Sequence, residues 1–228
     1  MPTTLQQLQQ NMLACRLCPH DGYDIQPPAV FSGDNRARAM IIGQAPGSSE
    51  VVAGRPMNAG SGRRLFEWLG DAGWQEDDFR RRHYMTSVTK CYPGRSSSGK
   101  GDRVPTRAEQ AHCRPFLEQE IALVNPRLII PVGGLAIKLF YPARLRLDQV
   151  IGGAAYFPPH ALQDPVNFDL KQARRFDAFD PRRPREGRWL VPLPHPSGAS
   201  LWPNKPQNRT LITRATQILD AIRQSWNL

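Results

Sequence analysis

Short apolar runs alternate with amphipathic segments along most of the chain. The runs at 39–42, 84–89, 127–132 and 189–193 have the length and composition of buried strands. Apolar residues at helical spacing predict helices at 5–13, 61–69, 106–124, 133–139 and 209–226. Strands that alternate with helices favour an α/β fold, here a three-layer α/β/α arrangement around a central, mostly parallel four-stranded sheet.

Two segments interrupt this pattern. Residues 93–104 are rich in Gly and Ser and predict a loop, after which Thr106 and Glu109 form a capping-box pattern that opens a helix. Pro115 is expected to kink or restart that helix. Residues 152–188 contain many prolines and an arginine cluster, which predicts a basic insertion within a single domain spanning 1–228.

The charge balance points to a class of partner. The chain carries 30 Lys and Arg against 20 Asp and Glu, a formal net charge of +10. Such a field concentrates polyanions, so nucleic acid is favoured, although a solvated arginine surface would give the same balance. Because no signal peptide and no stretch of about 18 apolar residues is visible, we expect a soluble, monomeric, cytoplasmic protein without a membrane partner.

Four cysteines form a second signal. Cys15-x-x-Cys18 can hold one metal or one corner of a cluster, and Cys91 and Cys113 each lie beside the end of a predicted element. In a reducing compartment, metal ligation or burial is more common than a disulfide. Four thiolates suit either Zn²⁺ or a cubane iron–sulfur cluster.

Two loops follow predicted strands directly. Residues 43–47 read Gly-Gln-Ala-Pro-Gly, and residues 195–197 read His-Pro-Ser. Ligands of open α/β sheets bind at the carboxyl ends of the strands, so we expect both loops to face one pocket.

The order of these features resembles the iron–sulfur uracil-DNA glycosylases. Residues 43–47 match the family's G-[EQ]-A-P-G motif, residues 54–60 look like its G-R-P-F-V-G-x-A-G stretch, and residues 86–91 resemble its T-N-V-V-K-C strand. Residues 105–130 fit its P-T-x-x-E…C-R-P…x-P-R-x-I-I run, and residues 195–197 its second catalytic motif. Several matches in series are more specific than any one of them.

The resemblance implies a base-excision-repair hydrolase that cleaves the N-glycosidic bond of a flipped-out uracil in single- or double-stranded DNA. It implies a structural [4Fe-4S] cluster on Cys15, Cys18, Cys91 and Cys113. His195 would stabilise the departing base, and Gln44 and Glu50 would orient or assist the attacking water.

The same resemblance implies a set of contacts to the base, formed with His195 by Gly43, Gln44, Ala45, Met57, Asn58 and Ser87. Leu201 and Trp202 are the candidates for an apolar wedge that fills the gap left in the DNA.

Three residues depart from the family pattern. Gln44 replaces the usual Glu, Met57 a stacking Phe, and Ser87 a base-reading Asn, for which Asn58 is a possible substitute. Two alternatives therefore stay open. One is a glycosylase for another base, such as hypoxanthine or mismatched thymine, and the other is a non-catalytic DNA-binding protein that holds zinc.

Overall fold

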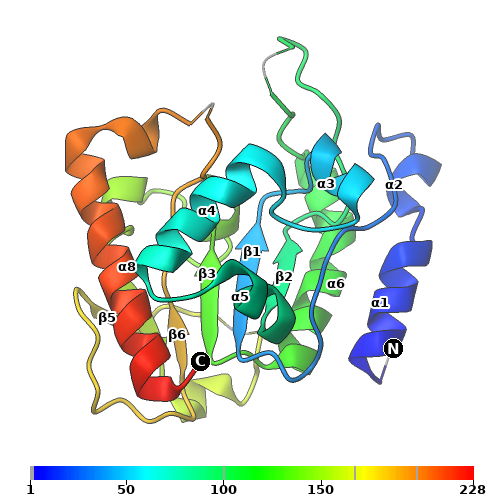
Figure 1. Ribbon diagram of the computed structural model, residues 1–228. Helices are drawn as coiled ribbons and strands as arrows, with labels where there is room; N and C mark the ends of the chain where they lie inside the picture. Colours follow the sequence, from blue (N-terminus) through cyan, green and yellow to red (C-terminus); the bar gives the residue numbers. More distant parts are fainter. Residues whose placement is uncertain (1–2, 100, 167, 199) are drawn as a thin grey trace.

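One twisted sheet organises the molecule. In this computed structural model, which describes residues 3–99, 101–166, 168–198 and 200–228, six strands lie in the order β2-β1-β3-β6-β4-β5 (Figure 1). They are β1 (Ala39–Gly43), β2 (Tyr84–Ser87), β3 (Leu128–Pro131), β4 (Ala154–Phe157), β5 (Arg174–Phe176) and β6 (Arg188–Leu190). The first three and β6 are parallel, whereas β4 pairs antiparallel with both β6 and β5.

The α/β class and the four parallel strands are as predicted, but the strand count of four was too low. The two additional strands, β4 and β5, lie inside the segment that the sequence indicated as an insertion. The many prolines and arginines of this segment do not form a strand pattern. In particular, β5 is only three residues long, and two of these are exposed arginines.

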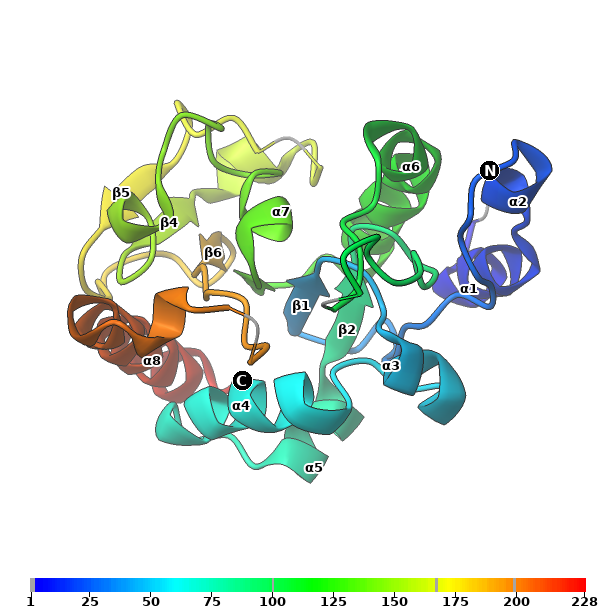
Figure 2. The same ribbon diagram turned by 90° about the horizontal axis from the view of Figure 1, so that it is seen from above.

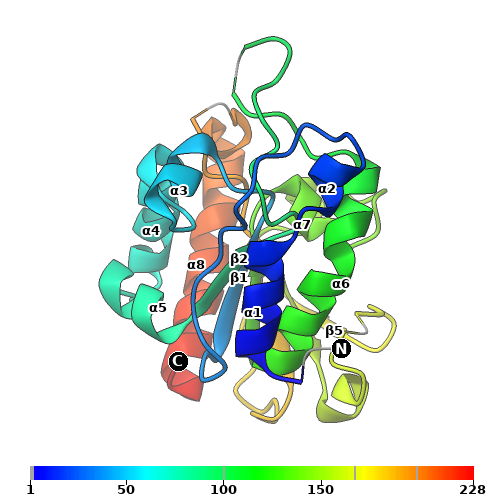
Figure 3. The same cartoon turned by 90° about the vertical axis from the view of Figure 1, so that its right-hand side faces the viewer.

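Helices cover both faces of the sheet. Their bounds are α1 (Leu5–Ala14), α2 (Leu17–His20), α3 (Ser48–Ala53), α4 (Ala59–Asp71), α5 (Glu76–Arg82), α6 (Arg107–Val124), α7 (Gly134–Ile137) and α8 (Pro206–Trp226). Viewed from above, α6 and α7 lie on one side of the sheet, and α4, α5 and α8 lie on the other (Figure 2). In the edge-on view α1 packs outside the sheet beside α6 (Figure 3).

The alternation of side chains along β1 explains these layers. Met40 and Ile42 pack in a cluster with residues of α1, α6 and α7, while Ile41 packs in the opposite cluster with α4, α5 and α8. Successive strand residues point to opposite faces, so a strand that is buried throughout reads as a continuous apolar run. Among the described residues, no helix has the length and apolar character needed to cross a membrane.

The start of α6 is the predicted capping box. Glu109 N–H donates to Thr106 Oγ1 (3.3 Å), and Thr106 N–H donates back to the Glu109 carboxylate (2.6 Å). The helix then continues through Pro115 to Val124, so the expected restart at that proline does not occur.

Strand register brings distant loops to one edge. Gly43, the last residue of β1, is in register with Ser87, the last residue of β2. On the other side of β1, Val132 forms a parallel bridge with Leu193, just before His195. The segments after β1, β3 and β6 therefore leave the sheet at the same end.

Candidate active site

A cleft opens at this carboxyl end of the sheet. It has a volume of about 750 Å³, counting the part open to solvent. Its walls come from the loops after β1 and β6, from the start of α3, from the segment before α4 and from the loop after β2. The lining includes Gly43, Gln44, Ala45, Gly47, Glu50, Met57, Asn58, Asp102, His195 and Ser197.

His195 carries a defined hydrogen-bonding pattern. Ser197 contacts His195 Nδ1 twice, through its Oγ (2.9 Å) and through its backbone N–H (3.2 Å), which can only donate. With Nδ1 accepting from this N–H, the proton of the neutral ring resides on Nε2. Burial lowers the pKa of His195 below its ordinary value, which favours this neutral form. The cleft therefore contains a neutral N–H donor.

The absence of a side chain at Gly133 leaves room for the His195 ring. A Cβ on Gly133 would lie 2.9 Å from His195 Cδ2, and the residue has a φ of +86°. Only glycine meets both requirements without strain. The sequence showed Gly133 and Gly134 after a strand, but the contact with His195 is tertiary and has no local signal.

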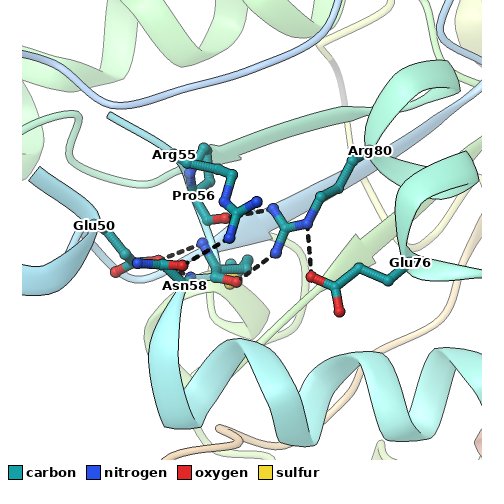
Figure 4. Close-up of polar contacts among 7 residues, drawn as sticks. Glu50, Arg55, Pro56, Asn58, Glu76 and Arg80 are labelled. Carbon is teal, nitrogen blue, oxygen red and sulfur yellow. Dashed lines mark hydrogen bonds and ion pairs between the residues drawn. The ribbon is translucent and has the colours of Figure 1, made fainter. Parts of the chain in front are cut away.

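Glu50, on α3, holds two loops together. Its carboxylate accepts hydrogen bonds from the backbone N–H groups of Gly47, Met57 and Asn58. Figure 4 shows Glu50 beside Asn58. Burial raises the pKa of Glu50, while these N–H donors act in the opposite direction and the nearby Asp102 adds to the rise. Glu50 thus lines the cleft, with both carboxylate oxygens bound to the backbone.

The side chains of Met57 and Ser87 both lie close to Gly43. A Cβ on Gly43 would lie 2.6 Å from the Met57 methyl and 3.2 Å from Ser87 Oγ, so all three residues are in close contact. Met57 lines the cleft and Ser87 does not. The predicted contact residues thus come together, with Ser87 behind the cleft wall.

The side-chain amide of Asn58 links its own loop to α3. Its Oδ1 accepts from Arg55 Nη2 (3.0 Å), and its Nδ2 donates to Ser49 O (3.3 Å). Gln44 also lines the cleft, and its backbone carbonyl accepts from Thr89 N–H (3.2 Å), which extends the pairing of β1 with the segment after β2.

Asp102 is a cleft residue that the sequence analysis missed. It comes from the Gly/Ser-rich loop, and its Oδ1 accepts a hydrogen bond from Tyr92 Oη (2.9 Å). An Asp in such a loop has no local pattern that distinguishes it from a solvated residue.

The two wedge candidates have different surroundings. Leu201 is 72% exposed, whereas Trp202 is half-buried and packs against both core clusters. Of the two, Leu201 is the side chain free to enter DNA.

The four cysteines line one apolar cavity beside α1, α2 and α6. None of them forms a disulfide. Burial, together with the neighbouring thiols, raises the pKa of Cys18 to about 11 and that of Cys91 to about 12. Within the described ranges, no three His, Cys, Asp or Glu side chains converge on the site of a single metal ion. Four thiol side chains around one cavity are a donor set that suits either a cubane cluster or a tetrahedral zinc.

Two basic residues of the segment 90–103 are engaged inside the protein. Lys90 Nζ lies 2.5 Å from Glu120 Oε2 in a buried pair, and Arg103 binds Glu109 at 2.6 Å. Arg95 is exposed, and Lys100 lies outside the described residues.

In the insertion, Arg182 and Arg183 bind Asp180, each at 3.0 Å. Both residues precede Arg188, the first residue of β6, and therefore lie toward the end of the sheet opposite His195.

Comparison with known proteins decides the family. A sequence profile described as the uracil DNA glycosylase superfamily matches residues 30–220. The chain belongs to this superfamily. The matched segment includes the two glycosylase motif loops, Cys91 and Cys113, so the predicted family is confirmed.

Named relatives lie within the superfamily. The chain is 34% identical over 148 residues to a type-4 uracil-DNA glycosylase of Pyrobaculum aerophilum, covering 65% of this chain and 70% of the relative. It is 33% identical over 111 residues to that of Thermotoga maritima, covering 49% and 53%. A type-4 glycosylase of Sulfurisphaera tokodaii is 26% identical over 204 residues, covering 79% of this chain and 87% of the relative.

Proposed function

We propose that this protein is a uracil-DNA glycosylase that hydrolyses the N-glycosidic bond of a flipped-out uracil in DNA. The observation that carries the proposal is the neutral His195, whose protonated nitrogen is left free by the Ser197 contact, in a cleft beside the Gln44 loop. Family membership and the names of the relatives support the same activity.

The roles of the cleft residues follow from the charges that develop as the glycosidic bond breaks. Breaking the bond between C1′ and N1 leaves negative charge on the base and positive charge on the sugar. We assign His195 Nε2–H as the donor to the uracil O2, where a preorganised donor acts in the transition state. A neutral imidazole suits this role because it needs no proton loss or gain before the base leaves.

Water attack completes the reaction. We assign the Gln44 side chain to hold the water that forms the new bond to C1′, with its proton passing to solvent. Glu50 supports the developing sugar cation through its negative charge and keeps the two loops in place through its backbone contacts. The base would lie against Gly43, Ala45 and Met57, with Asn58 and Ser87 near its edge, and Leu201 would fill the vacated stack.

We also propose that Cys15, Cys18, Cys91 and Cys113 hold a [4Fe-4S] cluster with a structural role. When bound, it would connect α1 and α2 to α6 and to the segment after β2. Anaerobically purified protein should contain about four irons and four sulfides per chain. Stoichiometric zinc without iron would overturn this assignment and favour the non-catalytic alternative.

The decisive experiment is single-turnover excision from oligonucleotides that carry uracil, hypoxanthine or a G·T mismatch. Uracil should be released fastest, and His195→Ala should reduce its release by at least about tenfold while DNA affinity changes little. Because burial depresses the pKa of His195, the rate should stay constant from about pH 6.5 to 8 and fall toward lower pH. Faster release of another base, or a rate that falls as the pH rises toward 8, would refute the proposal. The monomeric state and the cytoplasmic location stay predictions.

A further inference from the structure

The loop before α4 has a backbone that needs external support. Met57 and Ala59 both have a φ of 54°, in the left-handed region that residues other than glycine seldom adopt. Such conformations persist at functional sites only where the surroundings hold them. Because Met57 lines the cleft, whatever holds this loop also sets the shape of the base-binding wall.

Two charged side chains hold the loop from opposite sides (Figure 4). Glu50 accepts from the N–H groups of Met57 and Asn58, as described above. From the other side, Arg80 Nη1 donates to Pro56 O (2.9 Å), and Arg80 Nη2 donates to Met57 O (2.7 Å). The peptide groups around Met57 are therefore bound through their donors and through their acceptors.

Arg80 is itself fixed in place. Its Nε donates to Glu76 Oε1 (2.8 Å) one turn earlier in α5, and its guanidinium lies 4.4 Å from the centre of the Phe66 ring. The side chain is only 11% exposed. Arg80 is thus poorly placed to bind a DNA phosphate, because its Nε, Nη1 and Nη2 each donate to an acceptor within the protein.

The loop has little room for adjustment. A Cβ on Gly62 would lie 1.9 Å from Met57 O, and a Cβ on Gly43 would lie 2.6 Å from the Met57 methyl. Met57 is therefore confined at its carbonyl by Gly62 and Arg80, and at its side-chain tip by Gly43.

We infer that Arg80 is a positioning residue for base excision, acting through Met57. Its planar fork binds two successive carbonyls, which keeps Met57 in the left-handed conformation and its methyl against Gly43, at the wall where the base would lie. The expected change in excision rate rests on the proposed uracil excision, whereas the hydrogen bonds from Arg80 to Pro56 O and Met57 O are a property of the free protein.

The test combines kinetics with a direct view of Met57. The chain has five methionines, so methyl-¹³C-methionine labelling gives a small set of signals, and Met57→Leu identifies the one from Met57. Arg80→Met keeps an apolar side chain on Phe66 but adds a sixth methionine, whose signal is identified in the double variant with Met57→Leu. In Arg80→Met the Met57 signal should shift or broaden while the signals of the other four native methionines stay. The single-turnover rate on uracil DNA should fall by about tenfold to a hundredfold, the cost typical of a misplaced reacting group, with half-saturation by DNA changed less than about twofold.

Two further variants make the test specific. Arg81→Met removes the same charge from the same helix at a side chain that is 74% exposed and binds only Asp78 among the described residues, so it should behave as wild type. Arg80→Lys keeps a cation but lacks the fork, so it should fall between wild type and Arg80→Met. It also replaces Arg80→Met if that variant does not fold.

The outcomes separate the two levels of the argument. An unchanged Met57 signal in folded Arg80→Met, or an unchanged excision rate with a displaced signal, would overturn the positioning role. If the wild-type protein releases no uracil, the proposed function fails, and the methyl signals still decide whether Arg80 holds Met57.

Discussion

His83 provides a test of how burial is linked to stability. It lies between α5 and β2, is 2% exposed, and neither ring nitrogen has a hydrogen-bond partner among the described residues. Its ring packs 4.6 Å from Phe79 and 6.2 Å from Trp74, measured between ring centres. We consider His83→Phe, which keeps an aromatic ring in this apolar site and removes the two buried polar atoms.

The magnitude follows from the pKa. Burial, aided by the charges of Arg82 and Arg38 and opposed by that of Asp78, lowers the pKa of His83 to about 4. A group whose folded-state pKa is depressed contributes stability above its ordinary pKa of about 6.5 and loses it as the pH falls toward the folded value. Between pH 7 and pH 5, protonation of the unfolded chain at this residue should therefore remove about 2 kcal/mol from the free energy of unfolding.

The assay is denaturant unfolding at pH 7, 6 and 5. The wild type should lose about 2 kcal/mol more than His83→Phe over this range. At pH 7 the variant should be at least as stable, because removing buried polar atoms that lack partners is neutral or favourable. His20→Gln, at a side chain that is 85% exposed, is the matched control and should leave the pH dependence unchanged. Equal pH dependence in wild type and His83→Phe would refute the reasoning.

Two further sets of substitutions test the interior and the insertion. Lys90→Met leaves Glu120 buried without its cation and should cost about 3–5 kcal/mol in denaturant unfolding, whereas Lys90→Met with Glu120→Leu should recover most of the loss; equal stability of the single and double variants would contradict this. Neutralising Arg182 and Arg183 should leave the salt dependence of DNA binding unchanged, because both bind Asp180 toward the end of the sheet opposite His195. A slope of log K against log [salt] reduced by about two would instead establish phosphate contacts.

Local sequence patterns predicted most of the fold. The apolar runs located β1, β2, β3 and β6 because a strand buried on both faces needs continuous apolar residues, and the Thr106–Glu109 capping box marked the start of α6 because its contacts are three residues apart. The superfamily motifs identified the loops of Gln44 and His195, and both loops face one cleft, as expected for loops at the carboxyl ends of parallel strands.

Contacts between distant segments could not be predicted in this way. Asp102 enters the cleft because a loop folds toward Gly47, and Gly133 is needed because His195 packs on it. Arg188 ended the apparent arginine cluster, yet it is fully buried and donates to Pro126 O (2.7 Å), Pro165 O (2.6 Å) and Asn125 Oδ1 (2.8 Å). Neither its charge nor its neighbours in sequence distinguish it from an exposed arginine.

The antiparallel strands β4 and β5 change what the margin of the sheet presents to other molecules. Without them, β6 would end the sheet as a bare parallel edge whose free N–H and C=O groups could pair with a strand of another chain. The outermost strand is instead β5, three residues long with Arg174 and Arg175 exposed. A short, charged margin offers little to a second strand and so opposes self-association into extended sheets. Arg174 and Arg175 thus make this margin of the sheet a poor site for strand pairing between copies of the protein.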